Sequence, residues 1–325
     1  MSALLKATFA LACVVFATHQ AQAQNYPQRP ITIIVASSAG GPADTAARLI
    51  VDRMSAAFGQ QIIIETVAGA GGTIGMGRVA RAAPDGYTLL IHQNGFAITP
   101  AIHDKLPFDT RKDFVAVGLV NQSRTFLLGR KSLDAKNFTE LLAWMKLPAT
   151  TVKIAHPGKG TLGHLQLAAL ARTLGIKADF IPYRGSAMAL NDLLGGHIDI
   201  THVAAAVSAP YVSAGSVKAY AFTGDRRSNI SDVPTYGELG LPHMARSLWH
   251  MLFAPAGTPR PVLERINAVL IETLNDPHVV AAYANAGVES FPKERLSIEA
   301  ADAFLSQELD FYAKIVQETE FKTER

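Results

Sequence analysis

The feature that most constrains the fold is a unit that recurs along the chain: an apolar run, a glycine-containing loop and then a helical stretch. "ITIIV" leads to "SSAGG", "QIIIET" to "AGAGGT", "VKIAH" to "GKGT" and "ADFIPY" to "RGSA". Short apolar runs that alternate with helices are typical of strands in a sheet that helices cover on both faces. The sequence therefore predicts an α/β protein with mainly parallel sheets.

The units fall into two groups, which predicts two lobes. The chain has 325 residues, 49% of them hydrophobic, and this is enough for two sizeable cores. Two long amphipathic stretches follow, "PRPVLERINAVLIETLND" and "SIEAADAFLSQELDFYAKIV", with no strand expected between them. They most simply pack back on the first lobe. We expect lobe one to comprise 24–122 and 245–325 and lobe two 123–244, with a ligand cleft between them.

The first residues have the pattern of a secretory signal peptide. Lys6 supplies a positive start, "ATFALACVVFA" is a short apolar core, and "AQAQ" offers small residues for cleavage after Ala23. The apolar run is too short for an anchor helix. The only cysteine, Cys13, lies inside that run, which argues against a lipoprotein. With residues 1–23 removed the chain has no cysteine, so disulfides, thiolate metal sites and cysteine nucleophiles are excluded. We expect a periplasmic protein.

Charge patterning argues against nucleic acid and anionic membrane surfaces as partners. The 30 basic and 27 acidic residues are spread along the chain, and the net charge is only +3. There is no basic block of the kind that binds phosphate backbones or anionic lipid. No later apolar run reaches the length of a membrane span. We expect a soluble monomer.

The glycine loops predict anion binding, because a loop at a helix start exposes free N–H groups at the positive end of the helix dipole. A nucleotide is disfavoured as the anion. Residues 75–80, "GMGRVA", fit G-x-G-x-x-A, but the preceding strand ends several residues earlier and the next strand carries no acidic residue at its end. Residues 156–164, "HPGKGTLGH", lack the phosphate-loop spacing. No nucleotide or other cofactor is expected.

Enzymatic signatures are also missing. The chain contains neither G-x-S-x-G nor H-E-x-x-H. His156 and His164 lie eight residues apart without nearby carboxylates, so we expect a strand-end and a helix-surface histidine and no metal site. Ser37, His164 and Asp44 are of the types that form a triad, but nothing in their order predicts one. A carboxylate cradle explains all four loops, although each loop alone fits an ordinary turn that needs glycine.

Several stretches together resemble a known family. "ITIIVASSAGGPADTAARLI", "AGAGGTIGMGRVARAAPDGYTLL", "IPYRGSAMALNDLLGG", "DVPTYGELGLP" and "LFAPAGTP" are similar to the extracytoplasmic solute receptors of tripartite tricarboxylate transporters, the Bug family. The resemblance keeps the motif order over essentially the whole mature chain. It implies a two-lobed, Venus-flytrap-like periplasmic binding protein without catalytic activity. Such receptors hold small carboxylates largely through backbone N–H groups and ordered water, and deliver them to integral-membrane transporter subunits.

The resemblance also places the ligand loops. In lobe one they correspond to Ser37–Gly41, Ala70–Thr73 and Asn94–Ala97, and in lobe two to Lys159–Thr161, Arg184–Ala187 and the segment at Val203–Ala204. The expected ligand-binding residues are Ser37, Ser38, Ala39, Gly40, Gly41, Gly71, Gly72, Thr73, Asn94, Phe96, Gly160, Thr161, Arg184, Gly185, Ser186 and Val203, to which we add Arg124 near the lobe crossing.

The chain departs from the family pattern at informative positions. The family's P-F-A-P-G-G loop reads "ASSAGG" here, which should make the ligand site larger and more polar on the side of this first loop. In the second loop, the family's E-N-R-P-G-A-G-G reads "ETVAGAGG". Many members carry an aspartate where this chain has Val203, and a valine does not suit a ligand ammonium group. Arg124 stands where a small residue or proline is expected; its alternative role is that of a solvated linker arginine.

Other conspicuous residues have structural interpretations. Asp44 lies in a first helical turn, where it caps free N–H groups, and Arg48 is placed to pair with it at i,i+4. Trp144 and Trp249 are expected in the core or between lobes. We expect capture of a dicarboxylate without an ammonium group, long or aromatic, for a transporter. A serine hydrolase using Ser37 or Ser38 and a sensory receptor remain the alternatives.

Overall fold

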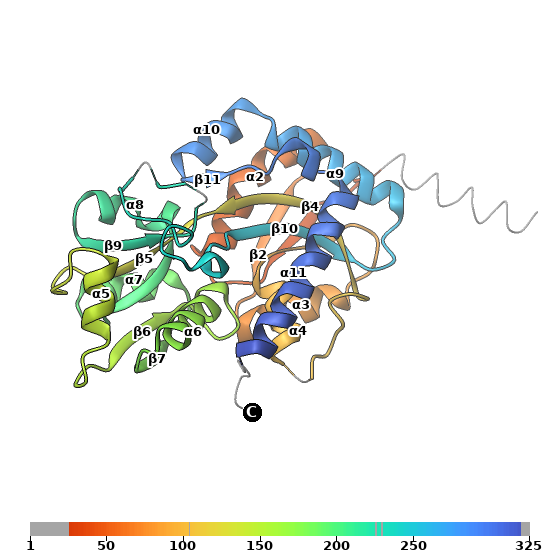
Figure 1. Cartoon of the computed structure of the whole chain (residues 1–325). Coiled ribbons are helices and arrows are strands. Elements are labelled where there is room, and N and C mark those ends of the chain that lie inside the picture. The colour runs from red at the N-terminus through yellow and green to blue at the C-terminus, as the bar shows by residue number, and fades with distance from the viewer. Residues whose placement is uncertain (1–25, 104, 225, 229, 320–325) are drawn as a thin grey trace, which may run out of the picture.

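The computed structural model describes residues 26–103, 105–224, 226–228 and 230–319. The expected signal peptide, residues 1–23, lies outside the described residues. Figure 1 shows two α/β lobes side by side, each built on a sheet with helices packed against it. The expected two-lobed α/β fold is therefore confirmed.

The first lobe is built on a six-stranded sheet in the order β11-β4-β10-β3-β1-β2. β1 is parallel to β2 and β3, whereas β10 is antiparallel to β3 and β4, and β11 is antiparallel to β4. The bounds are β1 Ile31–Val35, β2 Ile62–Thr66, β3 Thr88–Gln93, β4 Phe114–Ser123, β10 Leu248–Pro255 and β11 Val288–Glu289. Its helices are α2 Pro42–Phe58, α3 Thr73–Ala80, α4 Gly95–Ile102, α9 Arg260–Leu274, α10 Pro277–Asn285 and α11 Ile298–Thr319.

The second lobe is built on a five-stranded sheet in the order β7-β6-β8-β5-β9. β6 is parallel to β7 and β8, and β5 is antiparallel to β8 and β9. The strands are β5 Thr125–Arg130, β6 Val152–His156, β7 Ala178–Pro182, β8 Ile200–Ala204 and β9 Val217–Phe222. The helices are α5 Phe138–Met145, α6 Leu162–Leu174, α7 Ser186–Leu194 and α8 Ala205–Ser213. Short 3-10 turns occur at Ala70–Gly72, Pro242–Met244 and Lys293–Arg295.

Local sequence explains how the first glycine loop runs into a helix. Pro42 occupies the first turn of α2, where its missing N–H costs nothing. Ala43, Ala47, Ile50 and Met54 recur at helical spacing and are buried against the sheet. The helix then ends at Gly59, whose φ of 66° is a left-handed conformation that glycine adopts without strain. The loop before α2 is thereby fixed between a buried strand and a buried helix.

The sheets are mixed, whereas the sequence analysis predicted mainly parallel ones. The reason lies in how the chain passes between lobes. It leaves the first sheet at Ser123, enters the second at Thr125, and returns to the first at Leu248. β5 and β10 therefore start at the side where the lobes meet and run away from it, opposite to strands such as β1 and β3 that end there. The lobe limits 24–122 with 245–325, and 123–244, stay a proposal about which residues move together.

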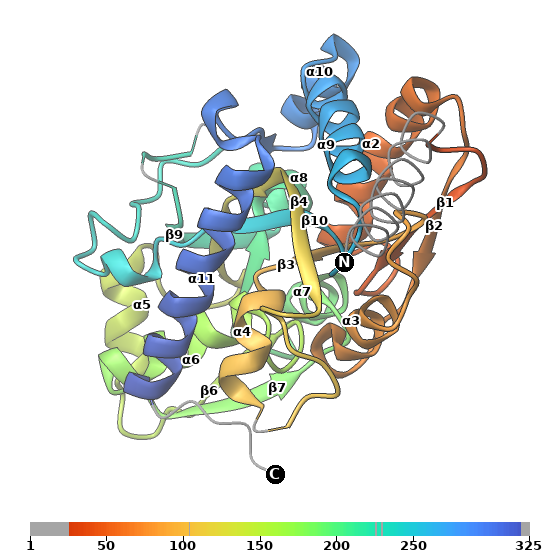
Figure 2. The ribbon, with the colours of Figure 1, turned by 90° about the vertical axis from the view of Figure 1, so that its right-hand side faces the viewer.

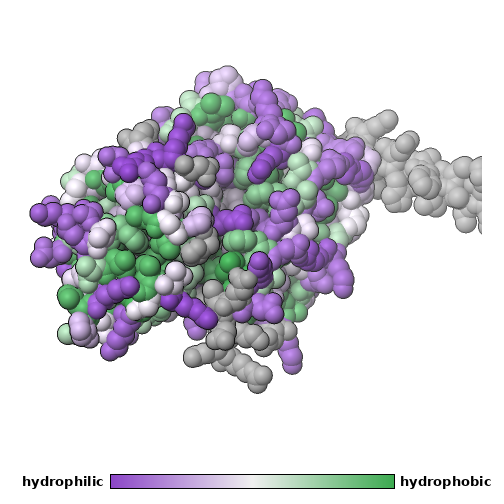
Figure 3. All heavy atoms as spheres, viewed as in Figure 1, coloured by the Kyte–Doolittle hydropathy of each residue, from purple (hydrophilic) through white to green (hydrophobic). Residues whose placement is uncertain are grey.

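The C-terminal helices pack on the first lobe. α9 contacts α2, and α11 contacts β4 and α4; Figure 2 shows α11 lying along that lobe beside α4. In the sequence, α10 and the two-residue strand β11 lie between α9 and α11, although no strand was expected between these two helices. On the face in Figure 3, hydrophilic side chains are widespread and apolar ones gather over the second lobe. Among the described residues, no helix is both long and apolar enough to cross a membrane.

Candidate ligand site

A cleft of about 1190 Å³ lies between the lobes, and all four glycine loops border it. Its wall contains eight of the residues expected from the sequence: Ser37, Ser38, Gly71, Gly72, Thr161, Arg184, Gly185 and Ser186. The loops come from the carboxyl ends of β1, β2, β6 and β7. Strand ends from both sheets thus meet at one cavity, where ligands bind in open α/β sheets.

Six helices begin at the cleft wall: α2, α3, α4, α6, α7 and α8. The residues that precede α2, α3, α4, α7 and α8 make no side-chain cap hydrogen bond. Only α6 is capped, by Thr161, whose hydroxyl accepts from the His164 N–H at 3.3 Å. Each helix start carries a partial positive charge and unsatisfied N–H groups. The arrangement is suited to an anion.

The charged side chains at the cleft have one sign. Lys105, Lys159 and Arg184 contribute to the wall, and none of the described lining residues is an aspartate or glutamate. A cleft lined by charges of a single sign focuses their field and raises the local concentration of the opposite ion. The electrostatics therefore favour an anionic ligand and disfavour a cationic one.

The first loop uses some of its donors internally. The Gly40 N–H donates to Asp44 Oδ2 at 2.8 Å, and Arg48 Nε pairs with the same oxygen at 3.0 Å. The structural roles expected for Asp44 and Arg48 are confirmed. The Gly41 N–H donates to the Ser38 carbonyl at 3.1 Å. Gly40 and Gly41 were expected to present these N–H groups to the ligand, and in this structure the groups are occupied.

The lobes touch across the cleft through glycines. The Ser38 hydroxyl donates to the Arg184 carbonyl at 3.3 Å. A Cβ at Gly185 would lie 3.0 Å from Ser38 Oγ, and one at Gly71 would lie 3.0 Å from the Lys159 carbonyl oxygen. Both glycines have positive φ, 122° and 67°. The two lobes can approach this closely because these positions carry no side chain.

Two stacked histidines hold the "GKGT" loop in place. The rings of His156 and His164 are 3.8 Å apart and nearly parallel, at 13°. The Gly158 N–H donates to His156 Nδ1 at 3.3 Å, and the Gly160 N–H to His164 Nδ1 at 3.4 Å. Burial lowers the pKa of both rings, to about 3 for His164, so they accept these bonds as neutral imidazoles. Both are buried, whereas His164 was expected on a helix surface. No metal-ligand cluster occurs among the described residues.

Two expected ligand contacts lie in the hydrophobic core instead. The ring of Phe96 is fully buried and stacks on Phe253 with centroids 4.0 Å apart. Val203 is buried in the second lobe, while its strand neighbours His202 and Ala204 border the cleft. Successive residues of a strand point to opposite faces, so Val203 faces away. The expectation that Val203 contacts the ligand is wrong for its side chain, and the preference against an ammonium group does not follow from it.

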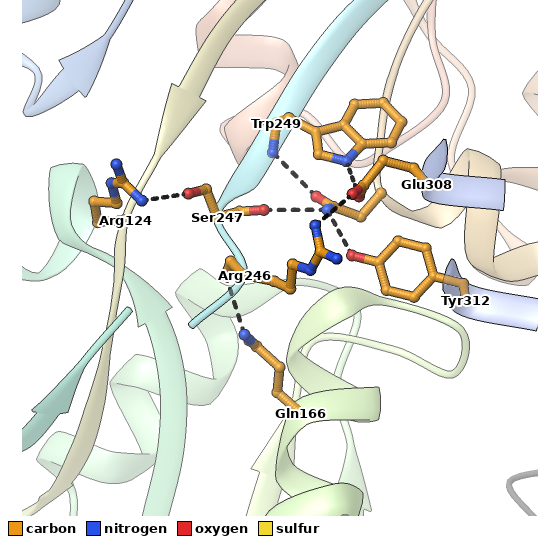
Figure 4. Close-up of polar contacts among 8 residues, drawn as sticks. Arg124, Gln166, Arg246, Ser247, Trp249, Glu308 and Tyr312 are labelled. Carbon is orange, nitrogen blue, oxygen red and sulfur yellow. Dashed lines mark hydrogen bonds and ion pairs between the residues drawn. The ribbon is translucent and has the colours of Figure 1, made fainter. Parts of the chain in front are cut away.

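Two other expected contacts belong to the place where the chain crosses between lobes (Figure 4). Asn94 Nδ2 donates to the Ser247 carbonyl at 3.1 Å and to Tyr312 Oη at 2.9 Å, and Asn94 Oδ1 accepts from the Trp249 N–H at 3.1 Å. Arg124 Nη1 donates to Ser247 Oγ at 2.7 Å, and its Nη2 lies 3.4 Å from Glu289 Oε2. Neither side chain is part of the cleft wall. Both fix the crossing segment, so Arg124 is not a solvated linker residue.

The same segment is tied to α11 and α6. We term these residues the crossing network: Gln166, Arg246, Ser247, Trp249, Glu308 and Tyr312, which Figure 4 labels, together with Asn94, which bonds to Ser247, Trp249 and Tyr312. Glu308 accepts from Arg246 Nη1 at 2.9 Å and from Trp249 Nε1 at 2.7 Å. Gln166 Nε2 donates to the Arg246 carbonyl at 3.1 Å. Burial raises the pKa of Glu308, and its bonds to Trp249 and Arg246 oppose this. The buried position expected for Trp249 is confirmed.

The remaining expected residues, Ala39, Thr73 and Gly160, are neighbours of lining residues and do not border the cleft themselves. Sequence reasoning missed other lining residues: His92, Gln93, Lys105, Thr125, Tyr183 and His202. His92 and Gln93 come at the carboxyl end of β3, and that position was the available signal; His202 lies in the middle of β8. Lys105 follows α4, and no sequence pattern marks it.

Comparisons with known proteins agree with this architecture. A family model described as the tripartite tricarboxylate transporter family receptor matches residues 46–320. A UPF0065 protein of Agrobacterium vitis is 38% identical over 300 residues, covering 92% of this chain and 87% of that protein. The protein BugT of Bordetella pertussis is 31% identical over 302 residues, covering 91% of each chain.

Solved structures are similar over their full length. The periplasmic binding protein BugD superposes with a TM-score of 0.86 at 32% identity, covering 92% of this chain and 100% of that one. MatC from Rhodopseudomonas palustris, solved with bound malate, gives a TM-score of 0.84 at 32% identity and covers 90% of this chain and 100% of that chain. A second R. palustris protein, solved with adipate, gives 0.84 at 26% identity, with 91% and 98% covered.

Proposed function

The chain belongs to the tripartite tricarboxylate transporter receptor family, and on that premise we propose that it captures a small dicarboxylate between its lobes. The observation that carries the proposal is the cleft wall. Six helix N-termini and the side chains of Lys105, Lys159 and Arg184 face one cavity with no described acidic residue among its lining. Such a wall suits carboxylates, because each can accept several charge-assisted hydrogen bonds.

In this proposal each lobe holds one end of the ligand. Ser37 and Ser38 with the Gly71–Gly72 turn contact one carboxylate, and Thr161, Arg184 and Ser186 contact the other. The first loop has Ser37 where the family pattern has phenylalanine, and Ala36 and Ala39 where it has prolines, which leaves room for a long or aromatic diacid. Binding shifts the lobes toward a closed state that makes contacts to both ends at once. The malate and adipate found in two related structures are ligands of this class.

We further propose that the receptor acts in the periplasm as a monomer, after loss of residues 1–23, and passes its ligand to integral-membrane subunits without catalysis. The hydrolase alternative finds little support in the geometry. Asp44 is engaged with Gly40 and Arg48, and His164 stacks on His156 and accepts from Gly160. These contacts do not align a serine, a histidine and an aspartate as a triad. A sensory role would use the same cleft.

A calorimetric screen tests the proposal. The mature protein is titrated with mono-, di- and tricarboxylates, aliphatic and aromatic, and its melting temperature is recorded with each. Saturable binding of a dicarboxylate, with the ligand recovered unchanged, is the expected result. At a hundred times the dissociation constant, the ligand should stabilise the fold by about 2.7 kcal/mol. Turnover of a bound ester or amide, or binding of no carboxylate at all, would overturn the proposal.

A further inference from the structure

The segment that returns from the second lobe to the first is held by a buried amide side chain from each lobe. From the second lobe, Gln166 Nε2 donates to the carbonyl oxygens of Met244 at 2.9 Å and Arg246 at 3.1 Å. From the first lobe, Asn94 Nδ2 donates to the carbonyl oxygen of Ser247 at 3.1 Å. Two successive carbonyl groups of one segment are therefore bonded to different lobes.

The second lobe also fixes the orientation of the Gln166 amide. Gln166 Oε1 lies 3.0 Å from His202 Nδ1, and Nε2 of the same ring lies 2.5 Å from Tyr236 Oη. Burial lowers the pKa of His202 to about 3, so the ring is neutral. Because Gln166 Oε1 can only accept, Nδ1 carries the ring proton and Nε2 accepts from the Tyr236 hydroxyl. The Gln166 amide thereby directs its N–H groups at the returning segment.

These contacts make Ser247 the pivot of the returning segment. A peptide group is planar, so a chain turns only about the φ and ψ angles at each Cα. The peptide plane with the Arg246 carbonyl is held by the second lobe, and the next plane, with the Ser247 carbonyl, is held by the first. The φ and ψ of Ser247 lie between the two planes. A rotation of one lobe against the other is therefore concentrated at this residue.

The outgoing segment has the same arrangement at Arg124. Ser123 pairs with Leu248 and Val288 in the first sheet. The Arg124 carbonyl accepts from the Ala205 N–H of the second lobe at 2.8 Å. The φ and ψ of Arg124 thus separate a residue held by the first lobe from a carbonyl held by the second, which makes Arg124 the second pivot.

The two pivots are bonded to each other through their side chains. Arg124 Nη1 donates to Ser247 Oγ at 2.7 Å, and Figure 4 shows the two side chains turned toward each other. Nη2 of the same guanidinium lies 3.4 Å from Glu289 Oε2 in the first sheet. The Arg124 side chain is only 15% exposed. The family pattern has a small residue or proline here, which supplies no guanidinium, so this link is a feature of this chain.

We propose that Arg124 and Ser247 form the hinge of this protein, and that Arg124 is the positioning residue that keeps both pivots on one axis. The residues that follow the pivots, Thr125 and Leu248, border the cleft, so a rotation at the pivots changes the cleft directly. The bond between the pivots restricts the lobes to rotation about this axis and opposes twisting. The inference concerns how the lobes move, and it holds whichever ligand the cleft binds.

Distances between two spin labels test the pivot in the ligand-free protein. Without residues 1–23 the chain has no cysteine, so labels attach only at I74C on the first lobe and M188C on the second, which are 55% and 52% exposed. In this labelled parent, S247G adds backbone freedom at the pivot and should widen the interlobe distance distribution by several ångströms. S213G, at the exposed end of α8, is the control and should match the parent. An S247G distribution as narrow as that of the parent would refute the pivot.

Side-chain variants test the link between the pivots, and they also serve if S247G does not fold. R124A and S247A should each widen the distribution, and the double variant should be no wider than R124A, because both changes remove the same bond. R124K keeps a cationic donor and should stay closer to the parent. A parent-like distribution in R124A, or widening that adds up in the double variant, would overturn the role of Arg124. No ligand is needed, so a failure of the carboxylate proposal would leave these results unchanged.

Discussion

The cleft and the crossing network both lie where the lobes meet, yet their polar groups are used in opposite ways. In the crossing network, Asn94 and Glu308 are buried and hydrogen-bonded through both of their polar side-chain atoms. In the cleft, Ser37 Oγ and both nitrogens of His92 form no hydrogen bond of normal geometry, and five of the six helix starts lack a side-chain cap.

The difference separates what holds the molecule together from what holds its ligand. A buried polar group that is paired within the protein contributes to stability, whereas removal of its partner costs the full desolvation penalty. A group left unpaired at a cavity contributes nothing until a ligand supplies the missing bond. Substitutions in the crossing network should therefore change stability, and those in the cleft should change affinity. Four experiments test this expectation.

The largest effect is expected at Glu308. E308A leaves the buried Trp249 indole N–H without its acceptor and a cavity beside it, and it removes the carboxylate from Arg246, whose side chain is 42% exposed and can be hydrated. Together these losses should cost about 3 kcal/mol. Urea unfolding should show this loss, while the folded fraction binds ligand with little change in affinity. The control is E299A, on the same helix as Glu308, which removes an exposed ion pair with Arg260 of α9. This variant should leave the unfolding midpoint nearly unchanged. A lost affinity with intact stability would contradict the contrast.

The next largest effect concerns lobe closure. In G185V the new Cβ would lie 3.0 Å from Ser38 Oγ, and the φ of 122° is unfavourable for any side chain. We expect affinity to fall by about a hundredfold, because closure contributes the contacts to the second carboxylate. G215A is the matched control, since Gly215 also has positive φ but faces open space. Equal ligand affinity in the two variants would show that binding does not require the two lobes to touch at Gly185 and Ser38.

A smaller effect is expected from the serines of the first loop. Replacing both Ser37 and Ser38 with alanine removes up to two charge-assisted hydrogen bonds and should weaken binding about tenfold or more. The melting point without ligand should hardly move, because Ser37 Oγ has no partner and Ser38 makes one long bond, at 3.3 Å. Titration calorimetry and a thermal melt on the same sample separate the two. Unchanged affinity would show that the two hydroxyls do not bind the ligand.

The smallest effect per residue is expected from pH. The pKa of His164 is about 3 in the folded protein, and that of His156 is also lowered, against 6.5 in the unfolded chain. The unfolded state therefore binds more protons as the pH falls below 6.5, and stability falls with it. From pH 7.5 to 5.5 the His164 ring should cost about 1 kcal/mol, and the His156 ring should add to this loss.

The two rings can be separated from the other buried histidines by a double variant. H156F combined with H164F should show a smaller loss of urea-unfolding stability between those pH values than the wild type. An identical pH dependence in the double variant would mean that the pair does not titrate in this window.

Much of the fold follows from local pattern. The stretches "FTELLAWM" and "VKIAH" coincide with α5 and β6, and the glycine loops lie where apolar runs meet helical ones. The Asp44–Arg48 pair is four residues apart on one helix, so spacing alone predicts it. Both sheets and their helices are recognisable because propensity and periodicity act over short distances.

The amino-acid pattern alone predicts the two-lobed α/β class and the strand-end glycine loops, and the family motifs predict a receptor of the tripartite tricarboxylate transporter family. Tertiary structure alone decided which residues reach the cleft. The Asn94 side chain donates to Tyr312, 218 positions along the chain, and to the carbonyl of Ser247, 153 positions along. No local sequence pattern predicts such distant partners. Val203 and His202 are adjacent in sequence yet face opposite sides of one strand. Burial and long-range hydrogen bonding depend on how distant segments pack, so the side of a strand that meets the ligand is fixed only when the lobes assemble.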